Sequence, residues 1–129
     1  MNPTMKITIY HNPSCGSSRN ALFAIRAAGH LPRIVDYQKT PLSRDELAAL
    51  IARMGVPVRS VMRATEPMFR ELGLDDASVS DDALLDAMAK CPILLNRPIV
   101  VVENGAQWAA KLCRPSETVK GMLAAALAA

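Results

Sequence analysis

The sequence predicts an α/β fold with a mixed four-stranded sheet and a helical insertion, and three features lead to this prediction. A strand, a loop and a helix open the chain, a long run of helical patterns follows, and a buried strand, a hairpin and a helix close it. Half of the 129 residues are hydrophobic but only 4% are aromatic, so we expect an aliphatic core. A chain of this length is expected to form one domain over residues 1–129.

The opening unit is a strand, a helix and a second strand. In the segment Met5–Tyr10 apolar and polar side chains alternate, which is typical of a strand. Over Leu22–Ala28 side chains recur at helical spacing, and Gly29 is a suitable helix stop. The segment Arg33–Tyr37 is a second short strand. Because this is a strand–helix–strand unit, we expect the two strands to be parallel.

A series of helical segments separates the two halves of the sheet. Ser43 and Glu46 form the pattern of a capping box, which begins a helix that Gly55 ends. Further helical segments are expected at Val56–Met62, at Glu66–Leu72 and from Ser80 onwards. Residues from about 43 to 90 are therefore predicted to form an all-helical insertion.

The closing part of the chain supplies the rest of the sheet. The segment Ile99–Val102 is uniformly apolar and β-branched, which favours a central strand buried on both faces. An Asn-Gly pair at 104–105 indicates a hairpin turn, after which Gln107–Leu112 returns antiparallel. A final helix opens at a Pro-Ser-Glu sequence. This order of elements is that of a thioredoxin-like fold, in which a cis proline commonly precedes the central hairpin, and Pro98 is the candidate.

Charge, hydropathy and cysteine content exclude several function classes. The net charge is only +3, with no basic run or aromatic-interleaved basic patch, so we expect no nucleic-acid partner. No apolar stretch reaches the length of a membrane span, so we expect no membrane association. The three cysteines, Cys15, Cys91 and Cys113, form no C-x-x-C pair and no zinc-ligand spacing. They indicate a reducing cytoplasm and no metal site.

Cys15 is the residue best placed to act as a nucleophile. It lies where a helix begins, and the free backbone N–H groups and positive dipole end there favour a thiolate. The alternative is a buried structural cysteine, but the loop position and the following Gly16 argue against it. Because Ser18 stands where a dithiol protein has its second cysteine, a reduction cycle needs an external thiol such as glutathione. Cys91 and Cys113 are expected to be structural.

One histidine and three arginines are candidates to complete the site around Cys15. An imidazole at His11 would favour the thiolate if it lies near the sulfur, whereas a structural role at a strand end is the open alternative. Guanidinium groups bind tetrahedral oxyanions in bidentate fashion, and several together would hold a dianion. Three arginines lie in apolar or proline-flanked contexts that suit this role: Arg63, Arg97 and Arg114.

Over nearly its whole length the sequence resembles the glutaredoxin-dependent arsenate reductases of the plasmid-borne ArsC type. The matching segments are, in chain order, Ile7–Asn20, Ser43–Leu47, Val58–Arg63, Pro92–Val101 and Leu112–Glu117. The first, fourth and fifth of these segments are specific motifs. The segment Glu103–Lys111 looks a few residues longer than the family's usual hairpin turn, and we expect the last helix not to be followed by the longer charged tail that some members carry.

The resemblance implies roles for six residues. Cys15 corresponds to the nucleophile, His11 to the histidine that lowers the pKa of the thiol, and Ser18 to a hydroxyl partner near the sulfur. The family's three oxyanion-binding arginines correspond to Arg63, Arg97 and Arg114. No metal or bound organic cofactor is implied. Glutathione is implied as a co-substrate and glutaredoxin as a protein partner.

The implied reaction is the reduction of arsenate to arsenite, an activity of arsenic resistance and detoxification. The Cys15 thiolate attacks arsenic and water leaves, glutathione attacks next, and arsenic passes from the +5 to the +3 state. Glutaredoxin then removes the glutathione, and arsenite is released.

Two other functions fit the same fold. One is a glutathione-dependent thiol oxidoreductase without arsenate activity, but such relatives often lack part of the arginine set or the Cys-Gly start, and both are present here. The other is a redox regulator that binds RNA polymerase. Such regulators carry a C-x-x-C switch, and Ser18 argues against one here.

Overall fold

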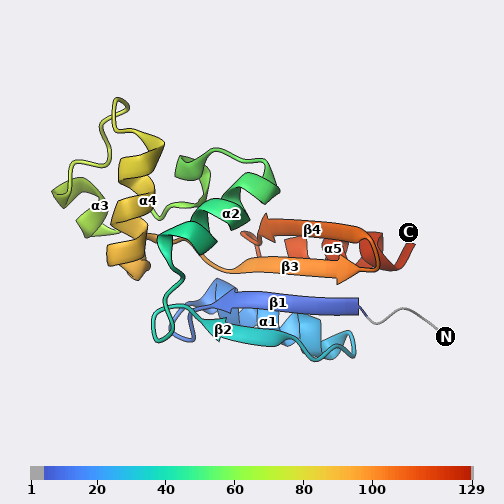
Figure 1. Ribbon diagram of the computed structural model, residues 1–129. Helices are drawn as coiled ribbons and strands as arrows, with labels where there is room; N and C mark the ends of the chain where they lie inside the picture. Colours follow the sequence, from blue (N-terminus) through green and yellow to red (C-terminus); the bar gives the residue numbers. More distant parts are fainter. Residues whose placement is uncertain (1–4, 129) are drawn as a thin grey trace. The chain divides into compact units, whose positions relative to one another are not determined.

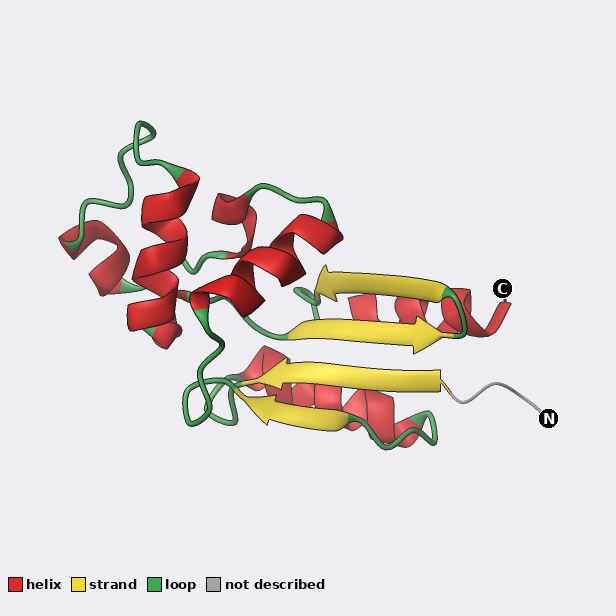
Figure 2. Cartoon of the chain, viewed as in Figure 1, coloured by secondary structure: helices red, strands yellow, loops and turns green. Residues whose placement is uncertain are grey.

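The computed structural model describes residues 5–128, and they form two compact units. One unit combines the chain up to Asp36 with the chain from Arg97 onwards, and it holds all four strands (Figure 1). The other unit is Tyr37–Asn96, and its regular structure is helical (Figure 2). This second unit contains the whole of the insertion expected at about 43–90. The single-domain organisation over 1–129 stays a prediction.

The sheet is mixed, as the sequence predicts. Its strands are β1 (Met5–His11), β2 (Arg33–Asp36), β3 (Ile99–Asn104) and β4 (Gln107–Leu112). They lie in the order β2-β1-β3-β4. The β1–β2 pair is parallel, and the β1–β3 and β3–β4 pairs are antiparallel. The arrangement confirms the expected parallel opening unit and antiparallel closing hairpin.

Strand β3 is central and its apolar run is buried. All four residues of Ile99–Val102 are at most 6% exposed, which confirms a strand covered on both faces. Pairing with β4 runs from Ile99 opposite Leu112 to Asn104 opposite Gln107, so only two residues form the turn. Gly105 adopts a φ of +64°, the left-handed conformation that this Asn-Gly turn requires.

Two helices cover one face of the sheet. These are α1 (Gly16–Ala27) and α5 (Thr118–Ala128), which lie on the same side of the strands (Figure 1). They share an aliphatic core with Ile7, Ile9, Val100 and Val102, the side chains that point to this face. Burial of this core holds the start of α1 beside the carboxyl end of β1. Among the described residues, no helix has the length and apolar character needed to cross a bilayer.

The second unit packs short helices against one another. Its elements are α2 (Arg44–Met54), the 3₁₀ turn η1 (Val58–Val61), α3 (Pro67–Glu71), α4 (Asp81–Lys90) and the 3₁₀ turn η2 (Pro92–Leu94). The predicted capping box is present: the Glu46 N–H donates to Ser43 Oγ at 3.1 Å, and the Ser43 N–H donates to Glu46 Oε1 at 3.0 Å. Gly55 ends α2 with a φ of +71°, as expected.

Candidate active site

A tightly bonded loop carries Cys15 to the start of α1. Cys15 is the N-cap residue of this helix, and its backbone N–H donates to the Asn12 carbonyl at 3.0 Å. Asn12 is buried, and its Oδ1 accepts from the Ser14 N–H at 2.9 Å. The Asn12 N–H in turn donates to Ser18 Oγ at 3.0 Å. Sequence reasoning missed Asn12, although an asparagine before proline is typical of such a turn.

The surroundings of the Cys15 sulfur favour its ionised form. Partial burial raises the pKa of Cys15, but hydrogen bonding outweighs it and the pKa lies below the ordinary thiol value. The largest favourable contribution comes from the backbone N–H of Ser18, and the guanidinium groups of Arg114 and Arg97 and the Ser17 N–H add to it. Nη1 of Arg114 is 3.6 Å from the sulfur. The helix start and two cations therefore act on one thiol.

A contact between two distant parts of the chain brings the two arginines together. The Cys113 N–H donates to the Pro98 carbonyl at 2.8 Å. Because Arg114 follows Cys113 and Arg97 precedes Pro98, this bond holds the two arginines side by side. Nη1 of Arg114 donates to the Arg97 carbonyl at 3.0 Å. The peptide bond before Pro98 is cis, which confirms the prediction, and the bond before Pro115 is also cis, which was not foreseen.

The two guanidinium groups differ in exposure. Arg97 is only 7% exposed, whereas Arg114 is exposed. A buried cation and an exposed cation beside the same sulfur, with backbone N–H groups from the helix start, can hold a tetrahedral anion against the nucleophile.

His11 and Ser18 form a buried pair behind this loop. His11 Nδ1 and Ser18 Oγ are 2.6 Å apart, and both side chains are at most 6% exposed. Burial lowers the pKa of His11, with the Asp36 carboxylate opposing this, so the neutral imidazole is favoured. Because Ser18 Oγ already accepts from a backbone N–H, we assign its proton to a donation toward Nδ1.

This pairing bears on the two thiolate-stabilising roles implied by the resemblance. Ser18 lowers the pKa of Cys15 through its backbone N–H, while its hydroxyl bonds His11 and the Asn12 N–H. His11 contacts the hydroxyl that fixes the loop, and it is favoured as a neutral rather than a cationic ring. Direct action of either side chain on the sulfur stays a prediction.

Arg63 belongs to the second unit. Its backbone N–H donates to the Leu94 carbonyl at 2.8 Å. Its Nη1 lies 3.5 Å from Asn96 Oδ1, and its Nε lies 3.9 Å from a Glu66 carboxylate oxygen. The guanidinium is thus held at the end of the segment that leads into Arg97. Its part in anion binding stays a prediction.

The other two cysteines differ from Cys15. Cys113 is fully buried, as expected of a structural residue, and burial raises the pKa of its thiol to about 11. Cys91 is half-buried at the end of α4. Within residues 5–128 no group of three or more His, Cys, Asp or Glu side chains is arranged to hold a metal ion.

These features define a class: a thioredoxin-like α/β protein with one activated cysteine at a helix start, where arginine side chains lower the pKa of the thiol. The particular family follows from comparison with known proteins. The sequence matches the ArsC family over residues 10–122, and the chain belongs to this family.

Bacterial arsenate reductases are similar to this chain in sequence, and a solved structure of one is similar to it in fold. The arsenate reductase of Rhizobium meliloti (strain 1021) is 54% identical over 119 residues, which cover 92% of this chain and 82% of the relative. That of Escherichia coli (strain K12) is 51% identical over 91% of this chain and 80% of its own length. The solved structure of the arsenate reductase from Vibrio cholerae is 40% identical, covers 92% of this chain and 98% of that one, and superposes with a TM-score of 0.84.

Proposed function

We propose that this chain is an arsenate reductase with Cys15 as its nucleophile. The observation that carries the proposal is the Cys15 sulfur at the start of α1, 3.6 Å from Arg114 Nη1, with a pKa that backbone N–H groups and the guanidinium groups of Arg114 and Arg97 lower. This combination supplies an ionised sulfur and a cationic anion site at the same point. Family membership and relatives named arsenate reductase at 50–54% identity support the same activity.

Arsenate binds as an oxyanion against Arg97 and Arg114. The Cys15 thiolate attacks arsenic, an As–S bond forms, and one arsenate oxygen leaves as water after taking up protons. The guanidinium groups hold the negative charge of the remaining oxygens, and a preorganised cationic site of this kind stabilises charge without reorganisation. Arsenic remains in the +5 state at this stage.

Two external thiols complete the reduction. Glutathione displaces a second oxygen as water and forms a second As–S bond. The thiolate of glutaredoxin then attacks the glutathione sulfur and forms a mixed disulfide with it. The electron pair of the broken As–S bond stays on arsenic, which becomes +3. Water then cleaves the bond between arsenic and Cys15, and arsenite leaves with the thiol regenerated. The chain has no second cysteine at position 18, which supports the need for outside thiols.

Two further residues have supporting roles in this proposal. Anion binding by Arg63 is implied by the resemblance alone. His11, through its 2.6 Å contact with Ser18, holds the loop that presents the nucleophile. Neither the nucleophile nor the anion site requires a metal ion or a bound organic cofactor.

A coupled assay tests the proposal. Purified chain, glutathione, glutaredoxin, glutathione reductase and NADPH are combined with and without arsenate, and with a small model disulfide in place of arsenate. We expect NADPH consumption that depends on arsenate and on both thiols, that Cys15→Ser abolishes, and that Cys91→Ser retains. Turnover of the disulfide but not of arsenate would instead indicate a glutathione-dependent oxidoreductase.

A further inference from the structure

A pocket of about 490 Å³ lies between α1 and α5, in the unit that contains Cys15. Its volume falls in the range of about 300–1,000 Å³ that is usual for small-molecule sites. Six of its lining residues matter here: Asn20, Phe23 and Ala24 on α1, Ser116 and Glu117 just before α5, and Lys120 in the first turn of α5. The chemistry proposed above uses none of them.

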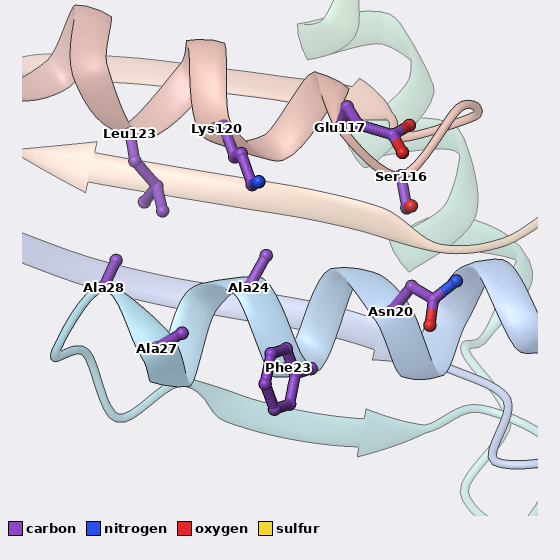
Figure 3. A pocket seen from close by; sticks show the side chains of 9 residues that line it. All are labelled: Asn20, Phe23, Ala24, Ala27, Ala28, Ser116, Glu117, Lys120 and Leu123. Carbon is purple, nitrogen blue, oxygen red and sulfur yellow. The ribbon is translucent and has the colours of Figure 1, made fainter.

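The polar end of this pocket is the end nearer the nucleophile. Asn20 follows Cys15 by five residues on the same helix, a rise of about 7–8 Å along its axis. Ser116 follows Arg114 by two residues. Figure 3 shows Asn20 and Ser116 at one end of the pocket, and Ala28 at the other. A molecule whose reactive atom is at Cys15 can therefore extend into the pocket from its polar end.

One negative side chain, Glu117, and one positive side chain, Lys120, line the pocket close to each other. The Lys120 N–H donates to the Glu117 carbonyl at 3.0 Å, so the two side chains are one helical turn apart. Residues at this spacing have Cβ atoms about 5–6 Å apart. Within residues 5–128 neither side chain forms an ion pair, and both are exposed. Lys120 points from α5 toward α1 (Figure 3).

The carboxylate of Glu117 and the ammonium of Lys120 complement a ligand group that carries a positive and a negative charge close together. An α-amino acid terminus does so, because its ammonium can bond Glu117 while its carboxylate bonds Lys120. In glutathione only the γ-glutamyl end has both charges on one carbon, since the glycine end has a carboxylate alone. The two methylenes of this residue have an apolar surface to cover at Ala24.

We infer that the pocket between α1 and α5 binds the γ-glutamyl end of glutathione while its thiol reaches the arsenic on Cys15, an inference that rests on the proposed function. An extended residue spans about 3.5 Å, and the γ-glutamyl residue adds two methylenes to that span. This reach covers the rise from Cys15 to Asn20, and the As–S bonds and the cysteinyl residue of glutathione extend it toward Ala24 and Lys120. The pocket thus selects the thiol donor, whereas the arginines select the oxyanion.

Binding of an unreactive analogue tests the inference without any turnover. S-methylglutathione has no free thiol, and its binding to the whole chain is followed by amide chemical shifts in NMR titrations. We expect shifts that concentrate at Asn20, Ala24 and Lys120, and an affinity about fivefold lower in Lys120→Met. S-methylcysteinylglycine, which lacks the γ-glutamyl residue and all of its contacts, should bind wild type more weakly than S-methylglutathione binds the variant.

Kinetics provides the second test. In the coupled assay Lys120→Met and Glu117→Gln should each raise the KM for glutathione about five- to tenfold and leave kcat and the KM for arsenate unchanged. Lys6→Met is the matched control, because Lys6 is exposed and alternates with Ile7, so it points away from the helices. It should behave as wild type.

The outcomes separate the two proposals. Arsenate turnover with an unchanged KM for glutathione in both variants, or analogue shifts outside the two helices, overturns the pocket assignment and leaves the proposed function standing. Analogue binding at the pocket without any arsenate-dependent turnover supports the pocket as a γ-glutamyl site and contradicts the proposed function.

Discussion

Removing the hydroxyl of Ser18 should destabilise the fold far more than a surface serine change does. Ser18 is completely buried, and its Oγ lies 2.6 Å from His11 Nδ1 and 3.0 Å from the Asn12 backbone nitrogen. In Ser18→Ala both of these groups lose a partner. Each is itself at most 6% exposed, so solvent does not reach it without a local opening.

The size of the effect follows from these two contacts. A buried polar group left without a partner costs about 1–3 kcal/mol, so two such groups cost about 2–6 kcal/mol. Alanine is a better helix former than serine by about 0.5 kcal/mol, and this offsets a small part. We therefore expect Ser18→Ala to lower the free energy of unfolding by roughly 2–5 kcal/mol.

Urea unfolding followed by circular dichroism measures this difference. Ser17→Ala is the matched control, because Ser17 is the neighbouring residue in the same helix and the change keeps its backbone N–H beside the sulfur. The control should stay within about 0.5 kcal/mol of wild type. A loss below about 1 kcal/mol in Ser18→Ala, comparable with the control, would refute the account of the hydroxyl as the bridge that fixes the loop.

Three more expectations rest on single contacts. Arg114→Gln should reduce kcat/KM for arsenate about 10- to 100-fold, which is the equivalent of one charged hydrogen bond. It should also raise the pKa of Cys15, which the rate of thiol alkylation against pH measures. Burial raises the pKa of the Cys113 thiol from 9.0 to about 11, so as pH rises the unfolded chain loses this proton before the folded chain does. The free energy of unfolding should therefore fall between these two pH values, by up to about 1.4 kcal/mol per pH unit. The fall should be smaller in Cys113→Ala. Ser43→Ala removes the cap of α2 and should cost about 1 kcal/mol in thermal unfolding without changing arsenate turnover.

Much of the fold could be predicted because its signals are local. The Ser43 capping box, the Asn-Gly turn at 104–105 and the apolar run Ile99–Val102 each specify their structure within a few residues. The extent of the second unit could not be predicted in this way. It begins at Tyr37 and ends at Asn96, and both ends lie outside the helical pattern that indicates the insertion.

The site was less accessible to sequence reasoning, because its geometry depends on contacts between distant residues. Placement of Cys15 at a helix start is a local feature and was predicted. The meeting of Arg97 and Arg114 depends on a hydrogen bond from Cys113 to Pro98, which no local pattern encodes. Local context marked these two arginines as candidates and the resemblance gave them a role, while the structure supplies the physical reason for their meeting.

Burial explains why the structure of His11 differs from what the sequence suggests. Four residues before the cysteine, His11 was expected to favour the thiolate if its ring lay near the sulfur. The ring is 6% exposed, its pKa is lowered by burial, and it bonds Ser18. Whether an imidazole is cationic depends on the packing around it, and sequence spacing carries no information about that packing.

The central claim is that one sulfur rests ionised in an anion-binding site. The rate of Cys15 alkylation by iodoacetamide, measured by peptide mass spectrometry against pH with and without arsenate, tests this most directly. We predict a midpoint below the ordinary thiol pKa and a marked slowing of alkylation when arsenate is present. A midpoint at or above the ordinary value, together with no protection by arsenate, would contradict the account.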